Sequence, residues 1–100
     1  MIVADISIIP IGAGESISKF VARAVDELKK TGLKVEVTAM STVVEAESAE
    51  KLFYAVQRAR EAVFELGAKR VYTIIRLDDR RDKKLSIEGK KSAVGDKKVK

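Results

Sequence analysis

The sequence predicts an α+β fold of the ferredoxin-like class. Such a fold has the element order βαββαβ, a four-stranded antiparallel sheet and two helices on one face. Two observations predict it. Segments rich in Ile and Val alternate with segments whose apolar residues recur at helical spacing. In addition, residues 1–38 and residues 42–78 each follow the pattern strand–helix–strand. We therefore expect one domain over residues 1–100, with a short C-terminal helix and a basic tail at 80–100.

The first predicted strand covers residues 2–9, and Pro10 should end it. Residues 12–14 read Gly-Ala-Gly, which predicts a tight turn, and Ser16 can cap the helix that follows. Gly32, placed just after a basic last turn, should end this helix. Its apolar face is marked by residues spaced three and one apart: Ile17, Phe20, Val21, Ala24, Val25 and Leu28.

Apolar and polar residues alternate over 33–38, which predicts a half-buried strand. Residues 39–41 should form a turn, and residues 42–46 the third strand. Ser48 can cap the second helix, and Gly67 should end it. The apolar face of this helix is predicted to consist of Leu52, Val56, Ala59, Val63 and Leu66.

Residues 71–78 form the fourth predicted strand, and Ser86 can cap the short terminal helix. Right-handed crossovers would place the first and third strands in the centre of the sheet, with both main helices on one face. The other face would then be bare. Such a face, with two open sheet edges, favours burial in an oligomer. Its candidate residues are Ser7, Ile9, Tyr72 and Ile74.

The composition narrows the range of functions. The chain has no Cys, which excludes disulfide scaffolds, zinc fingers and thiol nucleophiles. It also has no His, the commonest general base and transition-metal ligand. We therefore expect a binding protein rather than an enzyme, without a metal or cofactor. The Lys- and Glu-rich chain has no Asn and a single Gln, as in proteins of hyperthermophiles.

Hydropathy predicts a cytoplasmic protein. The longest apolar runs, such as residues 8–11, are far shorter than a membrane span. The chain does not open with a basic segment followed by an apolar stretch, so no secretory signal is expected.

The formal net charge of +5 is unevenly distributed. Residues 1–79 carry a net charge of −1 and residues 80–100 carry +6. The basic tail has two interpretations: a solvated terminal helix, or a footprint through which a regulatory module binds protein or RNA. RNA binding on a sheet of this class uses stacked aromatic rings, and Tyr72 is the only aromatic residue on a predicted strand. Nucleic acid is therefore an unfavoured partner.

Two other patterns have simple structural explanations. Asp78, Asp79 and Asp82 could bind Mg²⁺, but the arginines among them favour internal ion pairs. The Gly-Ala-Gly turn could cradle a phosphate, or the helix start at Ser16 could hold an anion, but the third glycine of a dinucleotide fingerprint is missing, since position 17 is Ile.

The carboxylates at Glu45 and Glu47 follow the hydroxyl pair of Ser41 and Thr42. Together such groups can hold a small ligand that carries a ring nitrogen, an amine or a positive charge. Glu47 could instead favour the positive end of the second helix. Glu45 lies within an apolar strand, where an unpaired carboxylate is costly.

Four segments of the chain are informative together: Ile6-Ser7-Ile8-Ile9-Pro10-Ile11-Gly12, Thr42-Val43-Val44-Glu45-Ala46-Glu47, residues 62–71 and residues 75–82. They resemble the small thiamine-binding protein family of archaea, bacteria and yeast, and the similarity covers about residues 2–94. The resemblance implies a ferredoxin-like subunit of a homotetramer arranged as a dimer of dimers. It also implies binding of thiamine, or of its hydroxymethylpyrimidine moiety, without catalysis, in a pocket near a subunit interface.

The resemblance also carries a candidate site onto this chain. Residues 41–45 match the ligand-side segment of the family, which indicates Ser41, Thr42 and Glu45 as ligand-binding residues. Their hydroxyl and carboxylate groups suit an aminopyrimidine. Candidate residues for the pocket wall are Ile9, Pro10, Met40 and Tyr72.

Overall fold

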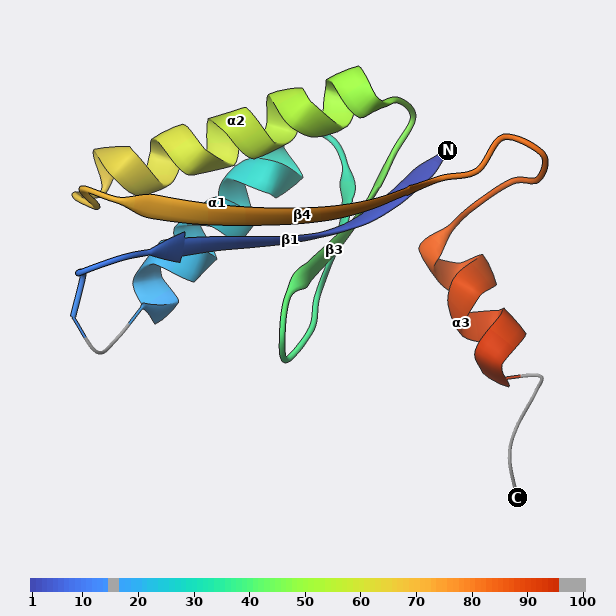
Figure 1. Ribbon diagram of the computed structural model, residues 1–100, viewed down its shortest axis with the longest axis horizontal. Coiled ribbons are helices and arrows are strands. Elements are labelled where there is room, and N and C mark those ends of the chain that lie inside the picture. Colours follow the sequence, from blue (N-terminus) through green and yellow to red (C-terminus); the bar gives the residue numbers. More distant parts are fainter. Residues whose placement is uncertain (15–16, 96–100) are drawn as a thin grey trace.

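A computed structural model describes residues 1–14 and 17–95 (Figure 1). The strand order in the sheet is β2-β3-β1-β4, and every pair of neighbouring strands is antiparallel. The predicted element order and the central position of the first and third strands are therefore confirmed. The elements are β1 (Ile2–Pro10), α1 (Ser18–Lys30), β2 (Lys34–Val37), β3 (Thr42–Ala46), α2 (Ala49–Glu65), β4 (Val71–Asp79) and α3 (Ile87–Gly95).

The main core lies between one face of the sheet and the two long helices. In Figure 1, α1 and α2 lie together along the β1–β4 pair, while α3 lies apart from them, beyond the end of β4. Successive side chains of a strand point to opposite faces, so the even-numbered residues of β1 face the helices. The buried residues of this core include Ile2, Ala4, Ile6 and Ile8 from β1, Val44 and Ala46 from β3, Phe20, Ala24 and Leu28 from α1, and Leu52, Val56 and Val63 from α2.

The opposite face of the sheet is covered only in part. At one end, Leu85 and Ile87 bury Val3 in a second apolar cluster, with Val43 packed against it. At the other end Tyr72 and Ile74 stay exposed, and the register pairs them with Ile9 and Ser7. The prediction that these four residues share the face without helices is thus confirmed.

The ends of the helices agree largely with the sequence. The Ser48 hydroxyl accepts a hydrogen bond from Lys51 N (3.2 Å) and the Ser86 hydroxyl accepts one from Gly89 N (2.9 Å), so both predicted caps are confirmed. Gly67 ends α2 with φ of +116°, a conformation that costs other residues a steric clash with Cβ. The predicted cap at Ser16 lies outside the described residues.

Two expectations need correction. Leu66 is not part of the buried face of α2: it follows the last helical turn and is 42% exposed. The helix instead buries Ala55 and Ala62, whose small side chains let it approach its neighbours closely. Pro10 does not stop β1 before it but is its last residue, paired with Val71. A terminal position suits a residue that has no N–H to donate.

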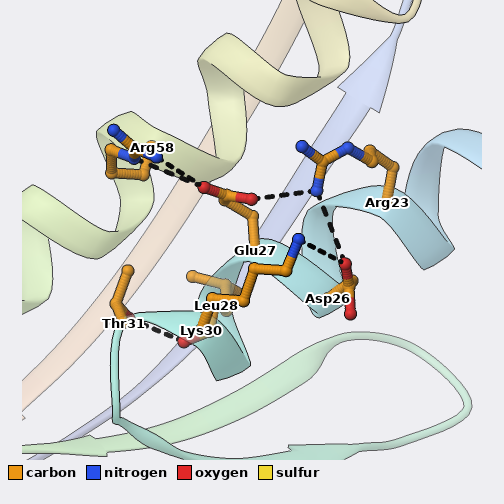
Figure 2. Close-up of polar contacts among 7 residues, drawn as sticks. All are labelled: Arg23, Asp26, Glu27, Leu28, Lys30, Thr31 and Arg58. Carbon is orange, nitrogen blue, oxygen red and sulfur yellow. Dashed lines mark hydrogen bonds and ion pairs between the residues drawn. The ribbon is translucent and has the colours of Figure 1, made fainter.

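A buried carboxylate ties the two long helices together (Figure 2). Glu27 is only 5% exposed, and its oxygens accept hydrogen bonds from Arg23 Nη1 (2.9 Å) and from Arg58 Nη2 (3.0 Å) of α2. These contacts lower the pKa of the Glu27 carboxyl, chiefly through Arg58 and then Arg23. The two arginines compensate the negative charge of the Glu27 carboxylate, which would otherwise be costly to bury at this position.

Candidate functional site

The tip of the β2–β3 hairpin is held by one hydroxyl group. Thr38 Oγ1 donates to Ser41 O (2.8 Å) and accepts from Ser41 N (3.1 Å). The main chain adds a bond from Thr38 N to Ser41 O (2.9 Å). A β-branched residue that bonds the backbone locally in this way favours a turn over a longer strand. These hydrogen bonds therefore fix the conformation of the hairpin tip, which carries Ser41.

The β1 strand extends well past this tip. Its pairing with β3 ends at Ile6↔Thr42, whereas its pairing with β4 continues to Pro10↔Val71. Within the described residues, the end of β1 therefore has a paired strand on one side only. On the other side, the strand edge faces the space between the hairpin tip and α1.

A cavity of about 320 Å³ fills this space. Its described walls are mostly apolar, and the polar residues among them are the hydroxyl-bearing Ser7, Thr38, Ser41 and Thr42. Its volume is at the lower end of the range for small-molecule sites. Val37 and Met40, at its rim, are 57% and 89% exposed. The lining residues are Ile6, Ser7, Ile8 and Ile9 from β1, Ile17, Val21, Ala24, Val25 and Leu28 from the α1 segment, and Val37 to Thr42 from the hairpin.

The structure brings together four of the seven residues predicted to form the site. Ser41 and Thr42, together with the wall residues Ile9 and Met40, all line the cavity. Pro10, Tyr72 and Glu45 are not among its lining residues. Tyr72 stands on the exposed sheet face beside Ile74.

The wall that α1 supplies was missed at the sequence level. Ile17, Val21 and Val25 line the cavity and are only half-buried, although they belong to the apolar face of the helix. The sequence signal for this wall was the width of the apolar face of α1, because a helix that packs only on a sheet needs a narrower apolar stripe.

Glu45 has other partners. Its Oε2 accepts a hydrogen bond from Ile87 N (3.0 Å), the first amide of α3, and lies 3.6 Å from Lys34 Nζ. A carboxylate at a helix N-terminus satisfies an otherwise free N–H and interacts favourably with the helix dipole. Glu45 therefore attaches α3 to the sheet, on the face away from the long helices.

Glu47, the other candidate carboxylate, lies outside the cavity as well. Its side chain pairs with Lys51 Nζ at 2.9 Å, which lowers the pKa of the Glu47 carboxyl. Both groups are exposed, so the pair contributes little to stability. Glu47 and Glu45 line a separate depression of about 610 Å³ near the start of α2.

The acidic residues at and just after the end of β4 form ion pairs, as predicted. Asp78 contacts Lys90, Asp79 contacts Arg81 (2.9 Å) and Asp82 contacts Arg80 (2.7 Å). The arginine hydrogen bonds lower the pKa of Asp79 and of Asp82. Within residues 1–14 and 17–95, no group of three or more His, Cys, Asp or Glu side chains could hold a metal ion.

The same ion pairs compensate part of the positive charge of the basic tail (residues 80–100). Arg80, Arg81 and Lys90 each have a carboxylate partner, and Lys91 lies 3.3 Å from Glu36 of β2. Four of the six described basic residues of this segment thus have a carboxylate partner at short range. Lys83 and Lys84 are exposed and form no ion pair within the described residues, and Lys97, Lys98 and Lys100 lie outside them. None of the helices in the described part of the chain is long and apolar enough to cross a membrane.

Comparisons with known proteins agree on one family. The sequence pattern of the family described as "Thiamine-binding protein" matches residues 4–95. A UPF0045 protein of Methanothermobacter thermautotrophicus is 42% identical, over 97% of this chain and 99% of its own length. The UPF0045 protein YqgV of Bacillus subtilis is 41% identical, with 94% of each chain covered.

A solved structure agrees with the sequence comparison. The crystal structure of the hypothetical protein MJ1052 from Methanocaldococcus jannaschii superposes with a TM-score of 0.87 at 40% identity. The match covers 94% of this chain and 95% of that one. The shared fold therefore extends over nearly the whole of both chains. The chain belongs to the thiamine-binding protein family.

Proposed function

We propose that this protein binds thiamine, or its hydroxymethylpyrimidine moiety, in the cavity at the hairpin tip and releases it unchanged. The observation that carries the proposal is the meeting of Ser41, Thr42, Ile9 and Met40 around one cavity of about 320 Å³. Membership of the thiamine-binding family supports the choice of ligand.

The chemistry of the walls suits the pyrimidine end of thiamine. Val21 and Val25 offer apolar surface to the faces of a ring, while Ser41 and Thr42 offer hydroxyl groups to its ring nitrogens and amine. Among residues 1–14 and 17–95, those lining the cavity include no Asp, Glu, Lys or Arg. A neutral ring therefore fits the interior better than the cationic thiazolium, which we place toward the rim.

The same lining favours binding over catalysis. Hydroxyl groups are the only polar side chains among the described residues that line the cavity, so these residues supply no general base of suitable pKa. A hydroxyl without a neighbouring base is a weak nucleophile. We accordingly propose a carrier or sensor rather than an enzyme.

We further propose that the ligand is enclosed by a second subunit in a homotetramer, a dimer of dimers. Three features support this. The outer edges of β2 and β4 have no neighbouring strand in the described sheet. Tyr72 and Ile74 leave an exposed apolar patch on the sheet face, and Val37 and Met40 stand exposed at the mouth of the cavity. Sedimentation velocity tests the assembly: the proposal requires a species of four chains, and a monomer at all concentrations contradicts it.

Substitutions at the two hydroxyl residues test the site. Ser41→Ala and Thr42→Val remove a hydroxyl group with little change of shape, and each should weaken thiamine binding about fivefold, the equivalent of one hydrogen bond. Ser92→Ala is the matched control, because Ser92 is exposed on α3 and does not line the cavity. Titration calorimetry on the three variants gives the dissociation constants. Equal affinity in the cavity variants and in the control would place the ligand elsewhere.

A further inference from the structure

We infer that the main-chain N–H and C=O of Ile8 are a recognition element of this cavity, and that they pair with a ligand edge that presents an acceptor beside a donor. The inference rests on the proposed function and deepens it. An aminopyrimidine has such an edge, formed by a ring nitrogen and the adjacent amine. Ile8 lines the cavity and is 7% exposed, so its backbone groups have little access to bulk water.

The direction of these groups follows from the hydrogen-bond phase of β1. In an antiparallel ladder, the N–H and C=O of one residue point to the same neighbouring strand, and successive residues alternate. Ile11 N donates to Arg70 O (2.8 Å), which continues the register of Pro10↔Val71. Odd-numbered residues of β1 therefore face β4, and even-numbered residues, Ile8 among them, face the side of β3.

The β2–β3 hairpin independently indicates the same hydrogen-bond directions for the residues of β1. The bond from Thr38 N to Ser41 O continues the β2–β3 ladder, so the odd-numbered residues of β3 face β2. Thr42 then faces β1 and pairs with Ile6, the last pair of that ladder. Ile8 is the next residue of β1 after Ile6 whose N–H and C=O point toward the side of β3, and no described residue pairs with these groups there. Pro10, the next residue of this phase, has no N–H.

An unpaired N–H and C=O in an apolar setting are costly unless a partner fills the space. A cavity that combines them with the hydroxyl groups of Ser41 and Thr42 has donors and acceptors on two sides of a flat ring. The backbone pair would fix the orientation of the ring, because both groups of one extended residue lie in the plane of the sheet. The hydroxyl groups can rotate and adapt to either polarity.

Amide hydrogen exchange of the intact protein, measured by NMR, tests this directly. Without ligand, the Ile8 amide should exchange faster than those of Ser7 and Ile9, which face β4. With saturating thiamine the exchange of Ile8 should slow at least tenfold. Val35 is the control: it faces the free edge of β2 and does not line the cavity, so its rate should not change.

A chemical variant gives a second readout. Replacing Ile8 by its α-hydroxy acid turns the amide into an ester, which removes the N–H but keeps the side chain. This variant should bind thiamine about fivefold more weakly, whereas the same replacement at Val35 should not change the affinity.

The outcomes separate the two proposals. If thiamine binds with measurable heat but the exchange of Ile8 is unchanged, the role of Ile8 is overturned and the binding site remains. An Ile8 amide that is already protected in the free protein also overturns it. If no heat of binding is found, the proposed function itself fails.

Discussion

Thr73 carries a hydroxyl oxygen that is buried and has no hydrogen-bond partner among the described residues. Its neighbours along β4 on the same face, Val71 and Ile75, pack against the main core. An unsatisfied hydroxyl in such a place costs free energy, because it loses its hydrogen bonds to water on folding.

We therefore predict that Thr73→Val raises the free energy of unfolding by about 1 kcal/mol. Urea unfolding followed by circular dichroism measures it. The matched control is Thr31→Val, which removes a hydroxyl that donates to Leu28 O (2.6 Å) and should destabilise the protein. A lower urea midpoint for the Thr73 variant would mean that its hydroxyl has a partner in solution.

Glu27 makes the stability of the protein depend on pH. Its pKa is lowered in the folded state by Arg58 and Arg23, so the contribution of this carboxylate is present above its unfolded pKa of about 4.3. The contribution is lost as the pH falls through the folded pKa. The wild type should thus be more stable than Glu27→Gln at pH 7, and the difference should shrink steadily as the pH falls below 4.

Urea unfolding between pH 7 and pH 3 checks this. Asp26→Asn is the control, because Asp26 lies one position away and is exposed, as is its ion-pair partner Lys30 (3.3 Å), and its contact with Arg23 is longer (3.6 Å). A difference between the wild type and Glu27→Gln that is independent of pH would contradict the account.

At the scale of elements, α3 depends on Glu45. This carboxylate accepts the hydrogen bond of Ile87 N and lies near Lys34, so Glu45→Ala should loosen the attachment of α3 to the sheet. We expect faster amide exchange in residues 87–95. Thiamine affinity should stay within about twofold of the wild type, because Glu45 does not line the proposed cavity.

The expectation drawn from the resemblance is different: a ligand contact by Glu45 predicts at least a tenfold loss of affinity, about 1.4 kcal/mol. A loss of affinity of this size, with the amides of α3 still protected from exchange, would indicate that Glu45 contacts the ligand. The two readouts are measured on the same variant, so they cannot be confused with each other.

The elements could be predicted because their signals are local. The alternation around Ile9 and Ile74 has the period of a strand, and Ser48 stands at the start of a helical stripe. The partners of Glu45 could not be predicted in this way, since Ile87 lies 42 residues further along the chain and approaches only when the whole sheet has formed. The role of Ile8 also depends on where a neighbouring strand ends, which its side chain does not reveal.

At the scale of the whole molecule, ion pairs connect elements that are distant in sequence. Glu27 joins α1 to α2, Lys91 joins α3 to β2, and Arg76 Nε donates to Asp5 across the β1–β4 pair (3.0 Å). Networks of this kind gain value at high temperature, because the cost of desolvating charges falls. Together with the low content of Asn and Gln, they predict a melting temperature above about 80 °C. Scanning calorimetry checks it, and cooperative unfolding near 50 °C would contradict it.

The central claim is that a flat, neutral ring enters the cavity at the hairpin tip while the charged end of the ligand stays outside. Titration calorimetry of the wild type with thiamine, with hydroxymethylpyrimidine and with the thiazolium fragment tests it most directly. The account predicts heat of binding with thiamine and with hydroxymethylpyrimidine, and none with the thiazolium fragment. Binding of the thiazolium fragment alone, or no heat from any of the three at millimolar concentration, would contradict it.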